Sequence, residues 1–221
     1  MKKIIAIVLA VSSLFFLTAT KVLAEWSAGV SVSAGHFKAT GQENEDGEIN
    51  KTVSTNKIEA KFAYPSIFVE YNTGRVSIGL DVIPGSVTTT EQARTDTGVG
   101  HDSLTTGNDV ITNTVSVEFS RHVSLYALVP ITDIGAFARV QIMRVDVETK
   151  ETLGSGSSYP DATMNGASLS LGYQHDTGGA FVRAEVGYSD YEEMTVTSST
   201  SNKVDVDVDG KWARISIGRS F

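Results

Sequence analysis

Apolar and polar residues alternate one by one through most of the chain after residue 25. Residues 26–35 read WSAGVSVSAG, which puts Trp, Ala and Val on one side of an extended chain and Ser and Gly on the other. A period of two is typical of β-strands, and no stretch repeats its apolar residues with a helical period. The pattern predicts an all-β protein whose strands have one apolar and one small polar face.

Eight strands of this kind are expected, and the connections between them alternate in length. The strands fall at about residues 26–35, 57–71, 76–82, 110–128, 136–148, 167–173 and 180–189, and in the stretch that ends at residue 221. Short turns such as NTGR and DTGG alternate with long polar loops such as TGQENEDGEINKTVSTN. Pro65 lies inside the second strand, where a missing N–H predicts a bulge or a change of face.

The layout predicts how these strands assemble. An even number of antiparallel strands, with short turns at one end and long loops at the other, is typical of a transmembrane β-barrel. Each apolar segment is close to the roughly 9–11 residues that cross a bilayer at a tilt. A soluble β-sandwich could also bury one face of eight strands, but only a closed barrel lets strands cross lipid. We therefore expect an eight-stranded antiparallel up-and-down transmembrane β-barrel over residues 25–221.

The first 24 residues have the features of a secretory signal peptide. Lys2 and Lys3 precede the apolar stretch IIAIVLAVSSLFFL, and small residues at Val22 and Ala24 predict cleavage before Glu25. The alternative is an uncleaved membrane anchor, but the apolar stretch is short for a span. The expected domains are thus a signal peptide, residues 1–24, and a barrel, residues 25–221.

The net charge and the cysteine content exclude two classes of protein. Removal of residues 1–24 takes away three of the 18 basic residues and none of the 26 acidic ones, which leaves a formal net charge of −11. A nucleic-acid partner is therefore not expected. The absence of cysteine excludes a small disulfide-stapled scaffold. A single domain and a monomer are the simplest expectation.

The segment DVDVDG, residues 205–210, resembles the start of an EF-hand calcium loop. An EF-hand needs a bidentate Glu at position 12, where this chain has Ser216, and its flanks should be helical. A strand with Asp205, Asp207 and Asp209 on its outward face fits better, unless a bulge at Gly210 turns them inward. Facing outward, they predict a solvated strand, or a weak Ca²⁺ or Mg²⁺ contact at the outer loops.

The polar faces of the strands carry charges that would lie inside the barrel. An eight-stranded barrel is narrow and side chains largely fill it, so buried charges should pair. We predict a salt-bridged plug, and the alternative is a small porin-like channel for ions or small solutes that the same groups line. The predicted lumen charges are Asp81, Glu118, Arg139, Arg183, Glu185 and Arg214.

Aromatic residues cluster near the short turns and the chain ends. Aromatic rings favour the membrane–water interface, which predicts a belt at the periplasmic side. The predicted belt residues are Trp26, Tyr71, Phe119, Tyr126, Phe137, Tyr173, Phe181 and Phe221.

Signals for catalysis are weak. The segment GSGSS, residues 154–158, lacks the strand-to-helix context of a hydrolase nucleophile. The four histidines have no metal-ligand spacing, so neither an enzyme nor a cofactor is expected.

The last strand, WARISIGRSF, places Ile215, Ile217 and Phe221 on one face and ends on Phe. It resembles the terminal signal by which outer-membrane proteins are delivered to the barrel assembly machinery, although Arg219 stands where an apolar residue is usual. The mature chain as a whole resembles the small OmpA/OmpX/opacity-type outer-membrane barrels. That resemblance implies a Gram-negative outer membrane, extracellular loops and periplasmic termini, but no single activity. We expect contact with the lipids and lipopolysaccharide of that membrane and a structural or surface-interaction role.

Overall fold

The computed structural model describes residues 25–44, 53–97, 110–131, 133–152, 158–199, 201 and 203–221. The predicted signal peptide lies outside these ranges. No helix among these residues is both long and apolar enough to cross a membrane. The described residues form ten strands: β1 (Glu25–Asn44), β2 (Val53–Asn72), β3 (Ser77–Thr88), β4 (Gln92–Thr97), β5 (Val110–Pro130), β6 (Ala136–Thr152), β7 (Ala162–Thr177), β8 (Ala180–Tyr191), β9 (Met194–Thr197) and β10 (Lys203–Ser220).

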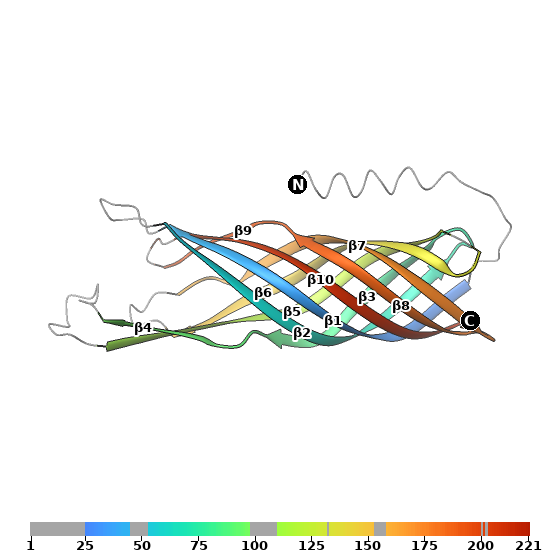
Figure 1. Ribbon diagram of the computed structural model, residues 1–221, viewed down its shortest axis with the longest axis horizontal. Coiled ribbons are helices and arrows are strands. Elements are labelled where there is room, and N and C mark those ends of the chain that lie inside the picture. Colours follow the sequence, from blue (N-terminus) through green and yellow to red (C-terminus); the bar gives the residue numbers. More distant parts are fainter. Residues whose placement is uncertain are drawn as a thin grey trace.

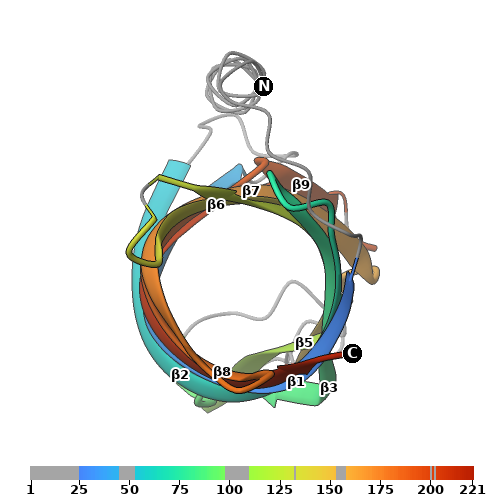
Figure 2. The same ribbon diagram turned by 90° about the vertical axis from the view of Figure 1, so that its right-hand side faces the viewer.

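Eight of the strands close into a ring, which Figure 2 shows along its axis. The order around the ring is β1, β2, β3, β5, β6, β7, β8 and β10, and β10 pairs back with β1. Every pairing is antiparallel. Strand β4 pairs with β5 and continues the line of β3, and β9 pairs with β10 and continues the line of β8. The predicted eight-stranded up-and-down barrel is therefore confirmed.

The two ends of the barrel differ. The start of β1 and the C-terminus meet at one end, where the N–H of Trp26 donates to the carbonyl of Phe221 over 3.2 Å and the N–H of Phe221 donates back over 2.8 Å. The short turns lie at this proximal end, to the right in Figure 1. At the opposite, distal end the strands run further into the expected loops than the sequence predicts, since β1 reaches Asn44 and β2 starts at Val53.

The barrel is longer than a membrane is thick. β1 has 20 residues, and at about 3.3 Å per residue such a strand is roughly 66 Å long. Only about 9–11 residues cross the hydrocarbon at a tilt. About half of the barrel therefore extends beyond it, and we call this the distal half; it begins beyond His36 on β1, Lys61 on β2 and Lys211 on β10.

The proximal half has an apolar exterior and a polar interior. Its exposed side chains are those that a transmembrane barrel presents to lipid, and they include Val30, Val32, Ile67, Val69, Ile78, Leu80, Leu125, Ile142, Leu169, Leu171, Val182, Val186, Ile215 and Ile217. Serines dominate the buried face, among them Ser27, Ser31, Ser33, Ser66, Ser124, Ser168, Ser170 and Ser216. Period-two alternation thus separates the two faces as the sequence predicts.

Glycines on the inner face make room for aromatic rings. Each of six inward rings lies directly opposite a glycine on the neighbouring strand, and a methyl group at that glycine would overlap the ring. The pairs are Phe68 with Gly29, Tyr126 with Gly79, Phe137 with Gly172, Phe181 with Gly218, Trp212 with Gly187 and Phe37 with Gly210. The glycines therefore leave the space in which these rings fill the lumen, and larger residues at the glycine positions would exclude the rings.

This pairing corrects half of the predicted aromatic belt. Tyr126, Phe137 and Phe181 have only 2%, 5% and 2% of their surface exposed and cluster inside the barrel with Phe68 and Leu128. They turn inward because a glycine stands opposite each ring. Phe119 also points inward, in the distal half. The outward, exposed members of the predicted belt are Trp26, Tyr71, Tyr173 and Phe221.

The change of face expected at Pro65 is wrong. Its neighbours on β2 keep alternating without a break, and Pro65 faces outward opposite Val32. The β2–β3 ladder extends only to Ile67, so the missing N–H of Pro65 breaks no bond on that side.

The registers shift elsewhere, on β3 and β5. One irregularity lies between Ile83 and Ser86 and the other between Ser120 and Val123, where Arg121 has a positive φ of 48°. The bulge on β5 changes which residues face the lumen. Odd-numbered residues point inward up to Phe119, and even-numbered residues point inward from His122 onward.

We expect Gly187→Val to lower the free energy of unfolding by about 1–3 kcal/mol, because the new side chain would overlap the buried Trp212 ring. Gly41→Val is the matched control, since nothing lies within 4 Å of a Cβ added there. Urea unfolding of the refolded mature protein in lipid vesicles measures both variants. Equal stabilities would show that ring packing over Gly187 is unimportant.

Candidate functional site

Buried charges from distant parts of the sequence meet in the proximal lumen. Five of the six predicted lumen charges lie there, namely Asp81, Arg139, Arg183, Glu185 and Arg214. Glu70 joins them, a residue that the sequence analysis did not single out. We call these six residues the lumen network. Glu70 could have been recognised in the sequence, because it is a charged residue within a segment long enough to span lipid.

One centre of the network is the pair of Glu70 and Arg183. The Arg183 guanidinium donates to both carboxylate oxygens of Glu70, over 2.7 and 3.1 Å. The hydroxyl of Tyr126 donates to Glu70 Oε1 over 2.7 Å, and Arg183 Nη2 donates to Gln174 Oε1 over 2.7 Å. A bidentate arginine–carboxylate pair of this kind is among the strongest side-chain contacts.

The other centre is Asp81, of which no surface is exposed. Its Oδ2 accepts hydrogen bonds from Arg214 Nη1 and from the Ser66 hydroxyl, both over 3.1 Å, and lies 3.6 Å from Arg139 Nη2. Arg139 Nη1 donates to Glu185 Oε1 over 3.4 Å. Arg139 thus links Asp81 to Glu185.

The network is charge-balanced and joins every strand of the ring. Three guanidinium groups face three carboxylates, which offsets the large cost of removing each charge from water. The participating side chains, with their hydrogen-bond partners, are Ser33 (β1), Ser66 and Glu70 (β2), Asp81 (β3), Tyr126 (β5), Arg139 (β6), Ser170 and Gln174 (β7), Arg183 and Glu185 (β8) and Arg214 (β10).

Aromatic rings complete the filling of the lumen. The Arg139 guanidinium carbon lies 3.6 Å from the centroid of the Tyr126 ring. The Arg183 guanidinium carbon lies 4.8, 5.3 and 5.6 Å from the ring centroids of Phe181, Phe137 and Phe68. Arginine over an aromatic face is a favourable cation–π arrangement. The network and these four rings form one continuous body, which we call the lumen plug.

Glu118 does not belong to the plug, which corrects its prediction as a lumen residue. It lies in the distal half, beyond the β5 bulge, and pairs with Lys150 at the barrel surface. The hydrogen bond from Lys150 holds the pKa of Glu118 below its usual range. The bulge is the physical cause, because one extra residue near Arg121 exchanges the faces of β5.

The acidic stripe of β10 faces outward. The β1–β10 ladder runs unbroken past Gly210, so Asp205, Asp207 and Asp209 share the face of Ile215 and Ile217. Residues two apart on one face of a strand are about 6.6–7 Å apart, so the three carboxylates cannot chelate one ion together. Within the described ranges, no group of three or more ligating side chains could hold a metal ion. A looser contact with Ca²⁺ or Mg²⁺ stays a prediction.

The predicted assembly-signal residues lie on the exposed outer face of β10 at the proximal end. Ile215, Ile217 and Phe221 are all strongly exposed, and so is Arg219 between them.

The interior of the distal half is apolar, which the sequence analysis did not anticipate. Val145, Val147, Met164 and Val208 form a buried cluster there, and Phe119 packs against it. Next to the cluster is a cavity of about 340 Å³. The sequence signal for this apolar interior was the alternation of Val204, Val206 and Val208 with the three aspartates.

Comparison with known proteins gives similarity of fold alone. No protein-family model and no curated protein matches the chain. The outer-membrane protease OmpT from Escherichia coli is similar over 94% of this chain and 100% of its own, with a TM-score of 0.48 and 10% identity. Neisserial surface protein A covers 86% of this chain and 97% of its own, with a TM-score of 0.38 and 10% identity.

The attachment invasion locus protein Ail of Yersinia pestis covers 86% of this chain and 99% of its own, with a TM-score of 0.36 and 12% identity. All three TM-scores lie below 0.5, so the assignment of the fold rests on the closed antiparallel ring itself. By that ring and its apolar outer band, the chain has the fold of the small outer-membrane β-barrels.

We expect Arg183→Met to lower the free energy of unfolding by about 3–5 kcal/mol, because it leaves the Glu70 carboxylate buried without its cation. Adding Glu70→Gln in the same chain should recover most of the loss. The matched control is Lys150→Met, which breaks a solvent-exposed pair and should cost far less, because water screens such a pair. Urea unfolding in vesicles distinguishes these cases, and equal losses at both pairs would contradict the assignment.

Proposed function

We propose that this protein is a non-conducting, non-catalytic barrel of a Gram-negative outer membrane that presents its distal half to the medium. The lumen plug carries the proposal. Its buried ion pairs join β2, β3, β6, β8 and β10 across the lumen, so ions would have to break them to pass. Hydrogen bonds extend the network to β1, β5 and β7. The role is therefore structural or one of surface interaction, and the protein acts as a monomer that the barrel assembly machinery inserts.

The polarity of the exterior supports the orientation. Apolar side chains surround the proximal half, where the start of β1, the C-terminus and the short turns lie, and short turns are typical of the periplasmic side. The exterior of the distal half instead carries charges such as Glu59, Glu148 and Asp207. On this basis the termini face the periplasm and the distal half faces outward.

Basic side chains at the distal edge of the apolar outer band support a contact with lipopolysaccharide. His36 on β1 lies directly between Lys61 on β2 and Lys211 on β10, and all three are exposed. Anionic headgroups would meet this row at the membrane surface, where lysines attract them.

The test of a closed lumen is the conductance of the refolded mature protein in a planar lipid bilayer. We expect no discrete openings from the native chain. The double variant Glu70→Ala and Arg183→Ala should give openings, because it removes one buried pair from the plug without changing its net charge.

The matched control is Glu118→Ala with Lys150→Ala, which removes a surface pair and should stay silent. Discrete, reproducible openings of the native protein, with insertion shown separately, would replace this proposal with a small channel for ions or small solutes.

A further inference from the structure

The distal half reverses the polarity of the proximal half. On β10 the inward side chains Val206 and Val208 alternate with the outward Asp205, Asp207 and Asp209. In the proximal half the same strand has Arg214 and Ser216 inside and isoleucine outside. A strand wall that is charged on its outer face and apolar on its inner face is stable with water outside and an apolar interior.

The apolar interior contains unfilled space that opens to the outside, since the lining residue Ile58 is exposed. The cavity of about 340 Å³ is lined by residues of β1, β2, β4, β5, β6, β7, β9 and β10, mostly Val, Phe, Thr, Ala and Met. It continues toward the plug as a smaller pocket of about 80 Å³, which shares Phe37, Phe62 and Phe119 with it. We call the two together the distal chamber.

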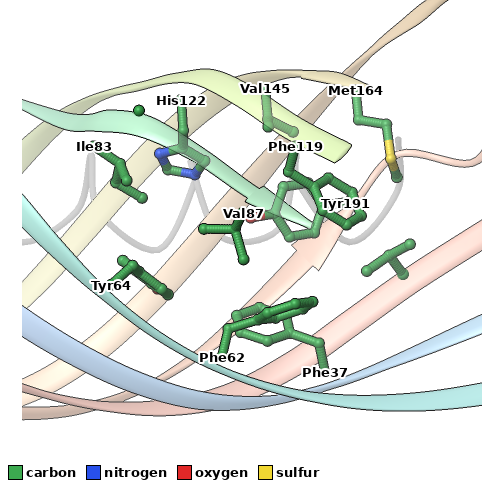
Figure 3. A pocket seen from close by; sticks show the side chains of 12 residues that line it. Phe37, Phe62, Tyr64, Ile83, Val87, Phe119, His122, Val145, Met164 and Tyr191 are labelled. Atoms are coloured by element: carbon green, nitrogen blue, oxygen red, sulfur yellow. The ribbon is translucent and has the colours of Figure 1, made fainter. Parts of the chain in front are cut away.

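Figure 3 shows how the inner part of the chamber is built. The rings of Phe37, Phe62 and Phe119 line one side in series, with centroids 6.0 and 6.1 Å apart, and Met164 lies nearby. Tyr64 and His122 close the side toward the plug. Burial raises the pKa of the Tyr191 phenol above its usual range, so this group adds no negative charge to the lining.

The chemistry of the lining selects the ligand. Among the described residues that line the chamber there is no lysine, arginine, aspartate or glutamate, so a buried ionic group would have no partner among them. Polar side chains lie on its distal side, among them Thr89, Thr90, Gln92, Ser116, Thr149 and Tyr159. A volume of this size with apolar walls and a few polar groups is typical of a small-molecule site.

The chain's own connections are poor candidates to fill this space. Residues 45–52 read EDGEINKT, residues 98–109 read GVGHDSLTTGND and residues 153–157 read LGSGS. These segments are polar and two of them are acidic, so their side chains do not match apolar walls.

We propose that the distal chamber binds a neutral single-chain amphiphile, with its hydrocarbon tail among the phenylalanines and its polar end at the distal side. The acidic exterior and the uncharged lining disfavour a carboxylate as the polar end. This inference is independent of whether the lumen conducts, because the chamber lies outside the plug.

Methionine signals provide a local readout. After residue 24 the chain has three methionines, Met143, Met164 and Met194. Met164 and Met194 line the chamber, whereas Met143 is buried in the barrel but does not line it. Titration of ¹³C-methyl-methionine protein in lipid nanodiscs with 1-decanol should give saturable shifts of Met164 and Met194 and none of Met143.

Two neighbouring positions on β1 supply the matched variants. Gly41 lines the chamber, and a side chain added there meets open space, so Gly41→Phe should fold and occupy the binding volume. We expect Gly41→Phe to weaken decanol binding by at least about tenfold, as the loss of two buried methylene groups would. Gln42→Phe points to the outside and should bind decanol as the native chain does.

The outcomes separate the alternatives. Shifts of all three methionines without saturation would mean partition into lipid only, and unmoved Met164 and Met194 would mean a chamber that is already filled; either result would overturn the proposal. Decanoate at pH 8 should bind more weakly than decanol. Equal binding of the two would overturn the preference for a neutral polar end.

Discussion

Mutual neutralisation of three arginines and three carboxylates is the interaction on which the proximal barrel depends. None of these groups could remain in a narrow lumen alone, because the loss of hydration would exceed any single contact. Each therefore requires a partner from another strand, as Arg183 requires Glu70 and Arg214 requires Asp81. Serine and glycine at the remaining inner positions leave the space in which long side chains and rings can reach across the ring.

The sequence predicts the ring and most of the lumen network, and its errors have physical causes. Period-two alternation identifies the inner face of β8 and β10, so Arg183, Glu185 and Arg214 could be placed from the pattern alone. Glu118 could not, because a single extra residue at the Arg121 bulge changes the face of β5 and leaves no compositional mark. The inward rings of Tyr126, Phe137 and Phe181 depend on glycines that are opposite them in space and distant in sequence. The distal chamber likewise depends on how all ten strands meet, so a single strand such as β10 shows only one part of its wall.

The barrel uses one strand geometry in two surroundings. In the proximal half the lipid is the apolar phase and the lumen holds the polar groups. In the distal half water lies outside and the apolar phase is inside. β10 makes this exchange without a change of register, since only the kind of residue at each position changes. β5 makes it with a bulge, which shows that the strands meet the same requirement in different ways.

The seam between the first and last strands has a consequence for folding kinetics. β1 and β10 pair continuously from Ser27 with Ser220 to Asn44 with Lys203, well beyond the membrane-crossing part. Its contacts join residues almost a full chain length apart, and such contacts require the largest loss of chain entropy before they give any stability. Closure of the seam should therefore be a late and slow event. Until it occurs, two long strand edges remain unpaired, and the chain in this interval is open to pairing with other chains.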